Sequence, residues 1–129
     1  MYNSRQFTVI FFYAVFIFCA FSYGVKSKVL WLTSNTHDFG KISKNEPAKF
    51  QFGFINISDT PITIDNVRTS CGCTAPNWTT NPIAPKDTSF IEIDFDARKV
   101  GHFKKNIKVY FSGQKKAEKL YILGEVIKK

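Results

Sequence analysis

Two cysteines stand one residue apart near the middle of the chain, at Cys71 and Cys73, with Gly72 between them. No other part of the 129-residue sequence concentrates reactive side chains in this way. Thiolates act as nucleophiles, exchange with disulfides and bind soft metal ions. If this protein carries out chemistry, we expect Cys71 and Cys73 to perform it.

The spacing of the two cysteines restricts how they can bond to each other. In an extended strand both side chains would face the same way, with Cα atoms ~6.5–7 Å apart. That separation is at or beyond the limit for a disulfide. A bond therefore requires the backbone to bend at Gly72, which glycine permits. We expect the resulting small ring to be strained, and strained disulfides are the more easily reduced ones.

Three roles for Cys71 and Cys73 remain open from the sequence. In the first role they are inert loop cysteines, either packed or bonded to each other. In the second they exchange between dithiol and disulfide, and in the third they bind a soft ion such as Cu(I) or Zn(II). A closed zinc site requires four ligands, which His37 and His102 would complete if the fold brought them near. Arg68, just upstream, would lower a thiol pKa by proximity. We predict no resident metal or other cofactor.

The rest of the sequence lacks the usual catalytic motifs. It contains no supported Ser-His-Asp set, no glycine-rich phosphate loop and no His-Glu-x-x-His motif. Asp94 and Asp96 imitate a carboxylate pair, but acidic residues alternating along an exposed strand are ordinarily just solvated. We predict that the protein is not an enzyme and has no catalytic residues.

The N-terminal residues predict export. Arg5 precedes an apolar run over residues 7–21, and Ser22-Tyr23-Gly24 supplies small residues for cleavage before Val25. This pattern is typical of a secretory signal peptide. We predict a signal helix over residues 1–24, which cleavage would remove together with Cys19. An uncleaved anchor is the alternative, although the 15 residues of this run are fewer than the ~17–25 of a membrane span. The anchor would be the only segment that enters the membrane.

The mature chain, residues 25–129, is predicted to be one basic domain. Removing Arg5 from the 18 Lys and Arg leaves 17 against 10 Asp and Glu, a net charge of +7. Ten of these basic residues lie between Arg98 and Lys129, with only Glu118 and Glu125 among them. Lysine on exposed strands protects sheets from aggregation, and it also suits an anionic partner such as lipid headgroups, an acidic glycan or an acidic protein. No nucleic-acid motif is present, and we predict no nucleic-acid partner.

Alternation of apolar and polar residues predicts an all-β fold. Phe50, Phe52 and Phe54 share one face of a strand over residues 48–56, as expected where one face of a strand is buried. Residues 90–96 and 101–111 alternate in the same way, and Lys105 falls on the apolar face of the second. Residues 29–32, 37–42, 62–67 and 120–126 supply the other expected strands. About seven strands in about 100 residues predict an immunoglobulin-like β-sandwich.

Several landmarks in fixed order give the chain a resemblance to a family. These landmarks are Phe39–Ile42, Phe54–Asn56, Pro61–Ile64, Ser70-Cys71-Gly72-Cys73-Thr74, Pro82–Pro85, Ile93–Asp96, Gly101–Phe103 and Leu123–Val126. Over about residues 36–127 the chain resembles the bacterial Domain of Unknown Function 1573 family. The resemblance implies an exported immunoglobulin-like envelope domain, and it assigns no catalytic residue. Lys86 departs from the family's usual glycine, which suggests a different turn there, and Ser112-Gly113 departs from the usual Ser-Asn.

Together these features favour a non-catalytic, exported module in the periplasm or cell envelope of a Gram-negative bacterium. We expect it to bind another envelope protein or an anionic surface through a sheet edge or the cysteine loop. The alternative is a periplasmic thiol protein that uses Cys71 and Cys73 for redox exchange or for binding copper or zinc.

Overall fold

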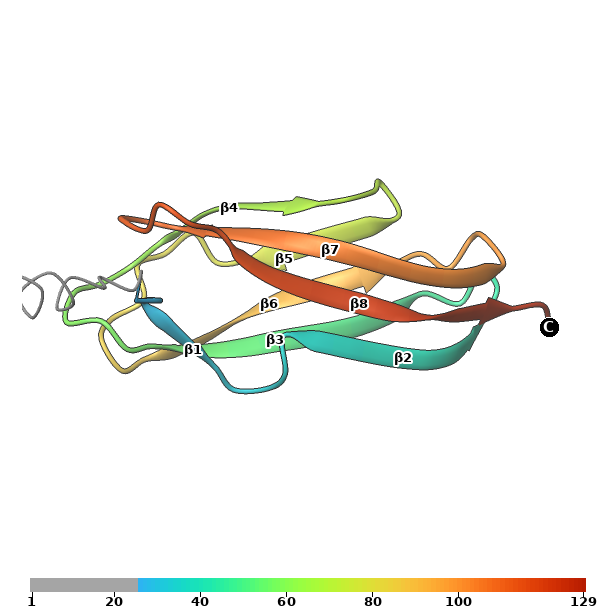
Figure 1. Cartoon of the computed structure of the whole chain (residues 1–129), viewed down its shortest axis with the longest axis horizontal. Helices are drawn as coiled ribbons and strands as arrows, with labels where there is room; N and C mark the ends of the chain where they lie inside the picture. Colours follow the sequence, from blue (N-terminus) through green and yellow to red (C-terminus); the bar gives the residue numbers. More distant parts are fainter. Residues whose placement is uncertain (1–25) are drawn as a thin grey trace, which may run out of the picture.

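The computed structural model describes residues 26–129, which form two packed β-sheets (Figure 1). The predicted signal helix and cleavage site lie outside these residues. The eight strands are β1 (Val29–Trp31), β2 (Thr36–Ser43), β3 (Ala48–Asn56), β4 (Ile64–Thr69), β5 (Thr74–Trp78), β6 (Thr88–Phe95), β7 (Gly101–Phe111) and β8 (Glu118–Ile127).

Each sheet contains four strands. The first has the order β1-β3-β6-β5 and the second the order β2-β8-β7-β4. All pairings are antiparallel except that of β2 with β8, which is parallel. The predicted all-β, immunoglobulin-like sandwich is therefore confirmed.

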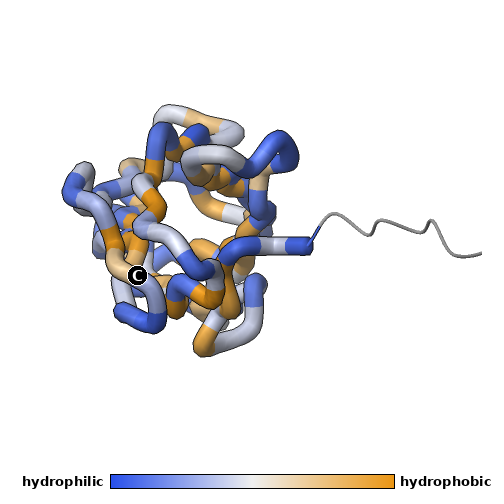
Figure 2. The backbone as a smooth tube through the Cα atoms, turned by 90° about the vertical axis from the view of Figure 1, so that its left-hand side faces the viewer, coloured by the Kyte–Doolittle hydropathy of each residue, from blue (hydrophilic) through white to orange (hydrophobic). Residues whose placement is uncertain are grey.

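The core lies between the inward faces that the alternation predicts. Phe52 and Phe54 of β3 are fully buried, and they face residues such as Ile107 and Val109 of β7, which are also fully buried. Orange and blue segments alternate along the tube when the molecule is viewed along its long axis (Figure 2). Burying two such apolar faces against each other is the main force that holds the sandwich together.

One strand was not predicted. Residues 74–78 form β5, although Pro76 argues against a central strand. The structure resolves this conflict because β5 lies at the edge of the first sheet and pairs only with β6. At an edge, the missing N–H of proline can face away from the sheet and break no ladder bond.

The turn at Lys86 keeps a glycine-like backbone without glycine. Lys86 has a φ of 67°, in the left-handed region that Asn45 also occupies with a φ of 64°. The lysine therefore adopts a conformation that glycine favours, and a turn type different from the family's usual one stays a prediction. Gly113, the other departure, has a φ of 64°, a conformation that both glycine and asparagine tolerate.

Candidate functional site

The two cysteines lie on one of the segments that pass from one sheet to the other. Residues 70–73 leave β4, an edge strand of the second sheet, and enter β5, an edge strand of the first. Cys71 and Cys73 form a disulfide, with their Cα atoms 5.3 Å apart. This is shorter than an extended backbone would give, so the chain does turn between them.

The turn does not depend on the special conformation of glycine. Gly72 is absent from the glycines with positive φ. A Cβ atom built on Gly72 would meet no atom within 4 Å. The expected bend between the two cysteines is therefore present, but it needs no positive φ at Gly72, and a Cβ atom would fit the same backbone.

Hydrogen bonds fix the cysteine loop to strands on both sides. Ser70 N–H donates to the carbonyl of Asn106 on β7 (3.0 Å), and Asn106 N–H donates to Ser70 Oγ (3.1 Å). On the other side, Asp96 N–H donates to the carbonyl of Cys73 (3.1 Å). Within the loop, Cys73 N–H donates to Cys71 Sγ (3.2 Å). The disulfide is thus held in one position relative to both sheets.

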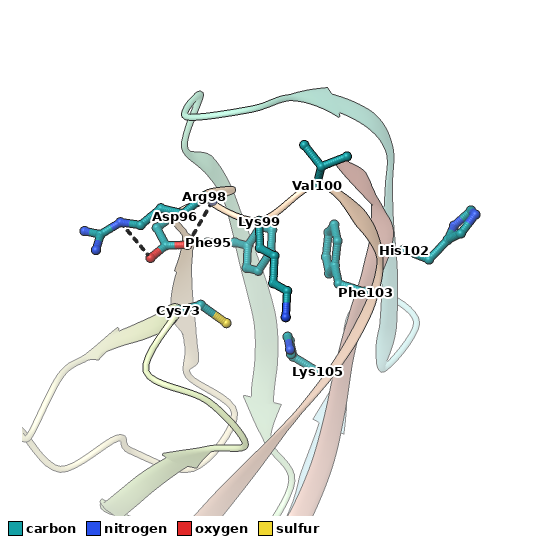
Figure 3. Close-up of a pocket in the computed structure, with 9 residues that line it drawn as sticks. All are labelled: Cys73, Phe95, Asp96, Arg98, Lys99, Val100, His102, Phe103 and Lys105. Atoms are coloured by element: carbon teal, nitrogen blue, oxygen red, sulfur yellow. Dashed lines mark hydrogen bonds and ion pairs between the residues drawn. The ribbon is translucent and has the colours of Figure 1, made fainter. Parts of the chain in front are cut away.

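Cys73 borders a pocket at the end of the sandwich. The pocket has a volume of about 370 Å³ and is lined by Cys73, Phe95, Asp96, Arg98, Lys99, Val100, His102, Phe103 and Lys105. The sulfur of Cys73 and the amino groups of Lys99 and Lys105 are directed into it (Figure 3). The rings of Phe95 and Phe103 stack 4.0 Å apart and form its apolar floor.

The connection between β6 and β7 shapes one side of this pocket. Ala97 is fully buried and has a φ of 50°, which is uncommon for a residue other than glycine. Asn45 N–H donates to its carbonyl (2.9 Å), and Gly101 follows with a φ of 123°. These constraints hold Arg98 and Lys99 at the rim. Backbone strain of this kind often accompanies functional sites.

The remaining candidates from the sequence do not gather around the cysteines. His37 on β2 stacks on Phe50 at 3.6 Å, and burial lowers the pKa of His37 although the neighbouring Asp38 opposes this. His102 borders the pocket, but its ring points away (Figure 3) and lies 3.9 Å from Glu125. Among residues 26–129, no three His, Cys, Asp or Glu side chains come together as a metal site would require.

Arg68 belongs to a different surface, the outer face of the second sheet. Its guanidinium lies 5.6 Å from the ring centre of Tyr110. The strand pairing places Arg68 opposite Lys108, and Lys108 opposite Lys119. Three exposed cations therefore stand in one row across β4, β7 and β8. Cross-strand neighbours have Cβ atoms ~4.5–5.5 Å apart.

Lys104 extends this cationic surface along β7. Its amino group lies 5.3 Å from the ring centre of Tyr121. We call Arg68, Lys104, Lys108 and Lys119, with Tyr110 and Tyr121, the basic face. The uneven charge was visible in the sequence, but the row was not, because it depends on which residues the strands place opposite one another.

The carboxylates of the same strands do not neutralise the basic face. Asp65 accepts a hydrogen bond from Thr63 Oγ1 (2.8 Å), and Glu118 accepts one from Ser27 Oγ (2.7 Å). Glu125 faces His102. Among the ion pairs of residues 26–129, none includes a cation of the basic face.

Comparisons with known proteins agree with the fold. A family model described as "Protein of unknown function (DUF1573)" matches residues 30–126. No curated protein matches the sequence. No helix that is long and apolar enough to cross a membrane occurs in the described part of the chain.

Three solved structures illustrate the architecture. A PapD-like domain of human CEP192 has a TM-score of 0.70 at 10% identity, covering 85% of this chain and 92% of that one. A protein of unknown function from Porphyromonas gingivalis W83 has a TM-score of 0.64 at 15% identity, covering 81% and 50%. The YadV chaperone has a TM-score of 0.54 at 7% identity, covering 78% and 52%. At these identities the likeness concerns the fold alone.

Proposed function

The chain belongs to the DUF1573 family, and we propose that it is an exported, non-catalytic immunoglobulin-like module that binds an anionic surface or partner in the bacterial envelope. The observation that carries the proposal is the row Arg68, Lys108 and Lys119 on the basic face. Like charges placed directly opposite each other destabilise a sheet. A row that costs stability and has no internal counterion is suited to an external anion.

The shape of the basic face also favours an extended anionic surface. The cations are exposed on a regular sheet: neighbours in the row are spaced by the strand separation of ~4.8 Å, and Lys104 lies ~13.6 Å from Lys108, four residues along β7. A flat array makes many weak contacts at once with a charged surface. Lys104 and Arg68 are held above tyrosine rings, which limits the side-chain entropy lost on binding.

Export is supported by the N-terminal sequence and by the cysteine pair. An apolar run after Arg5 and a small-residue exit are typical of a signal peptide. Disulfides persist in oxidising compartments such as the periplasm, and the Cys71–Cys73 bond suits such a compartment. Cell fractionation and N-terminal sequencing of the full chain test this point. We expect a periplasmic or envelope product beginning at Val25, and a cytosolic product with its leader intact would oppose export.

Binding is tested with the exported protein and vesicles of defined composition. We expect sedimentation with vesicles rich in anionic lipid and none with purely zwitterionic vesicles. At about 1 kcal/mol for each lysine near an anionic surface, the variant K104Q/K108Q/K119Q should bind about 100-fold more weakly. The control K44Q/K49Q/K86Q removes the same charge from outside the basic face. Equal losses in the two variants would show that net charge, and not this face, causes binding.

A second candidate function, thiol–disulfide exchange, is favoured by one observation. The sulfur of Cys73 is directed into a pocket that also receives two lysine amino groups. Thiol titration of the folded protein, with and without reductant, tests it together with metal analysis before and after reduction. We expect two titratable thiols only after reduction. Cysteines that stay unreactive and metal-free under both conditions would exclude exchange and soft-metal binding alike.

A further inference from the structure

Two lysines with no carboxylate partner meet the disulfide in the Cys73 pocket. Lys99 comes from the β6–β7 connection and Lys105 from β7, and both amino groups are directed into the pocket (Figure 3). None of the ion pairs of residues 26–129 includes either lysine. Asp96 is the carboxylate on the pocket wall, and it pairs with Arg98 Nε at 3.2 Å. The pocket therefore presents two uncompensated cations beside one sulfur.

The position of Lys105 is unusual for a charged residue. It shares the inward face of β7 with Phe103 and Ile107, and it stands opposite the fully buried Ile122. Charged side chains rarely occupy the inward phase of a strand unless something there requires them. At this end of the sandwich the pocket provides the space, so that the amino group reaches solvent beside Cys73 while the stem packs on apolar neighbours.

The two sulfurs have different surroundings. Cys73 lines the pocket, whereas Cys71 does not. Cys71 Sγ instead accepts the N–H of Cys73 at 3.2 Å, whereas the Thr74 hydroxyl lies near both sulfurs, 3.8 Å from Cys71 Sγ and 3.9 Å from Cys73 Sγ. A thiolate attacks a disulfide in line with the S–S bond and displaces the sulfur on the far side, so a thiolate held in this pocket meets Cys73 Sγ and displaces Cys71 Sγ. The N–H of Cys73 stabilises the negative charge that develops on Cys71 Sγ.

We propose that this pocket binds a small thiol carrying a carboxylate, and that Cys73 is the sulfur that this thiol attacks when it reduces the disulfide. The proposal rests on the second candidate function, thiol exchange. The thiolate of the small molecule attacks Cys73 Sγ, a new S–S bond forms to Cys73, and the Cys71–Cys73 bond breaks. The electron pair of that bond goes to Cys71 Sγ, which becomes a thiolate that accepts the N–H of Cys73.

A second small thiol completes the reaction. Its thiolate attacks the small-molecule sulfur of the mixed disulfide and releases the Cys73 thiolate beside Lys99 and Lys105. The net change is the oxidation of two small thiols to one disulfide and the reduction of the protein disulfide to two thiols. The carboxylate takes no part in bond making, and its role is to be held by the two ammonium groups while the thiolate reacts.

Three small thiols of different charge provide the test. Mercaptoacetate is anionic, 2-mercaptoethanol is neutral and cysteamine is cationic. Second-order rate constants for reducing the folded, exported protein are measured at low ionic strength and compared per thiolate after correction for thiol pKa. With each lysine contributing about 1 kcal/mol, or about fivefold, the two lysines together should make mercaptoacetate react about 25-fold faster than neutral 2-mercaptoethanol, and cysteamine, which they repel, should be slower still. High salt should largely remove the difference.

Matched variants locate the effect. K99Q/K105Q should abolish the preference for mercaptoacetate, whereas K104Q/K108Q, which removes two outward lysines of β7, should preserve it. Circular dichroism confirms that each variant is folded. Mass spectrometry of the trapped mixed disulfide should find the adduct on Cys73, with Cys71 open to alkylation. Adducts on Cys71, or equal loss of preference in both variants, would overturn the proposal.

The outcome also separates the two levels of the hypothesis. If no thiol reduces the folded protein while the unfolded chain is reduced normally, thiol exchange itself is wrong, and the pocket proposal falls with it. If all three thiols react at equal corrected rates, exchange stands and the charge selection by Lys99 and Lys105 is refuted.

Discussion

Reversing the charge of Lys108 should stabilise the fold and weaken binding at the same time. Lys108 stands between Arg68 and Lys119, so it has a cation on each side across the sheet. Two unit charges ~5 Å apart interact by about 0.8 kcal/mol in water, and measured cross-strand charge pairs contribute ~0.2–1 kcal/mol. The variant K108E converts two repulsions into two attractions. Allowing for exposure and screening, we expect a gain of about 1–2 kcal/mol.

The assay is thermal and chemical unfolding of K108E beside a control with the opposite expectation. For a domain of about 100 residues, 1 kcal/mol corresponds to ~4–8 °C in Tm. The control is K49E on the outer face of the other sheet, where Lys49 pairs with Asp94 at 3.2 Å. The same change there replaces an attraction with a repulsion and should destabilise by about 1 kcal/mol. Both variants carry the same net charge.

Two results would refute this reasoning. One is a loss of stability in K108E, which would mean that the row carries no net repulsion. The other is a gain in K49E as large as that in K108E, which would show that overall charge and not position is responsible. The gain in K108E should also shrink in concentrated salt, because exposed charges are screened. Vesicle binding should fall in K108E and persist in K49E.

Four further variants test the fold around the sites. N56L should destabilise the protein by about 2–4 kcal/mol in urea unfolding, since Asn56 is fully buried and its amide makes four hydrogen bonds, to Thr60, Ile83 and twice to Ser58; a loss below about 1 kcal/mol would contradict this. Burial lowers the pKa of His37 in the folded state, so on acidification the unfolded chain takes up a proton before the folded one. The contribution of His37 to stability should therefore be full above about pH 6.5 and fall as the pH drops below that value. In H37F this part of the pH dependence should disappear, and an unchanged slope of stability against pH would exclude His37 as its cause. G72A should keep the disulfide and change stability by less than about 0.5 kcal/mol, whereas failure to form the bond would show that glycine is required. K86G should raise the free energy of unfolding by about 1 kcal/mol, because it relieves a left-handed φ, and a decrease would show that the lysine makes a compensating contact.

Most of the fold could be predicted from the sequence because alternation is a local property. The inward phase of β3, β6 and β7 follows from residues two apart, and burial confirms it at Phe52, Ile93 and Val109. The strand β5 was not predicted, and its Pro76 is tolerated because β5 lies at an edge of the sheet. Whether a strand is central or at an edge depends on pairing between distant segments, which no local pattern contains.

The site was predicted only in part for the same reason. Cys71 and Cys73 stand out in the sequence, but the sequence left their bonding open. The pocket depends on Lys99, and the backbone at Ala97 that positions Lys99 has a φ of 50° in a residue that does not favour it. Tertiary contacts impose that conformation, so the residue types in the sequence do not predict it. One feature could have pointed to the pocket: Lys105 on an otherwise apolar face.

The basic face and the Cys73 pocket both take lysines from β7, so substitutions at single residues of this strand can separate the functions of the two surfaces. Successive side chains of a strand point to opposite faces, so β7 sends Lys104 and Lys108 to the basic face and Lys105 to the Cys73 pocket. If one function served both surfaces, K105Q and K108Q would impair vesicle binding and thiol selectivity together. We expect K105Q to change the thiol preference alone and K108Q to change vesicle binding alone. Because each substitution removes one charge from the same strand, a difference between them can come only from the face on which that charge stands.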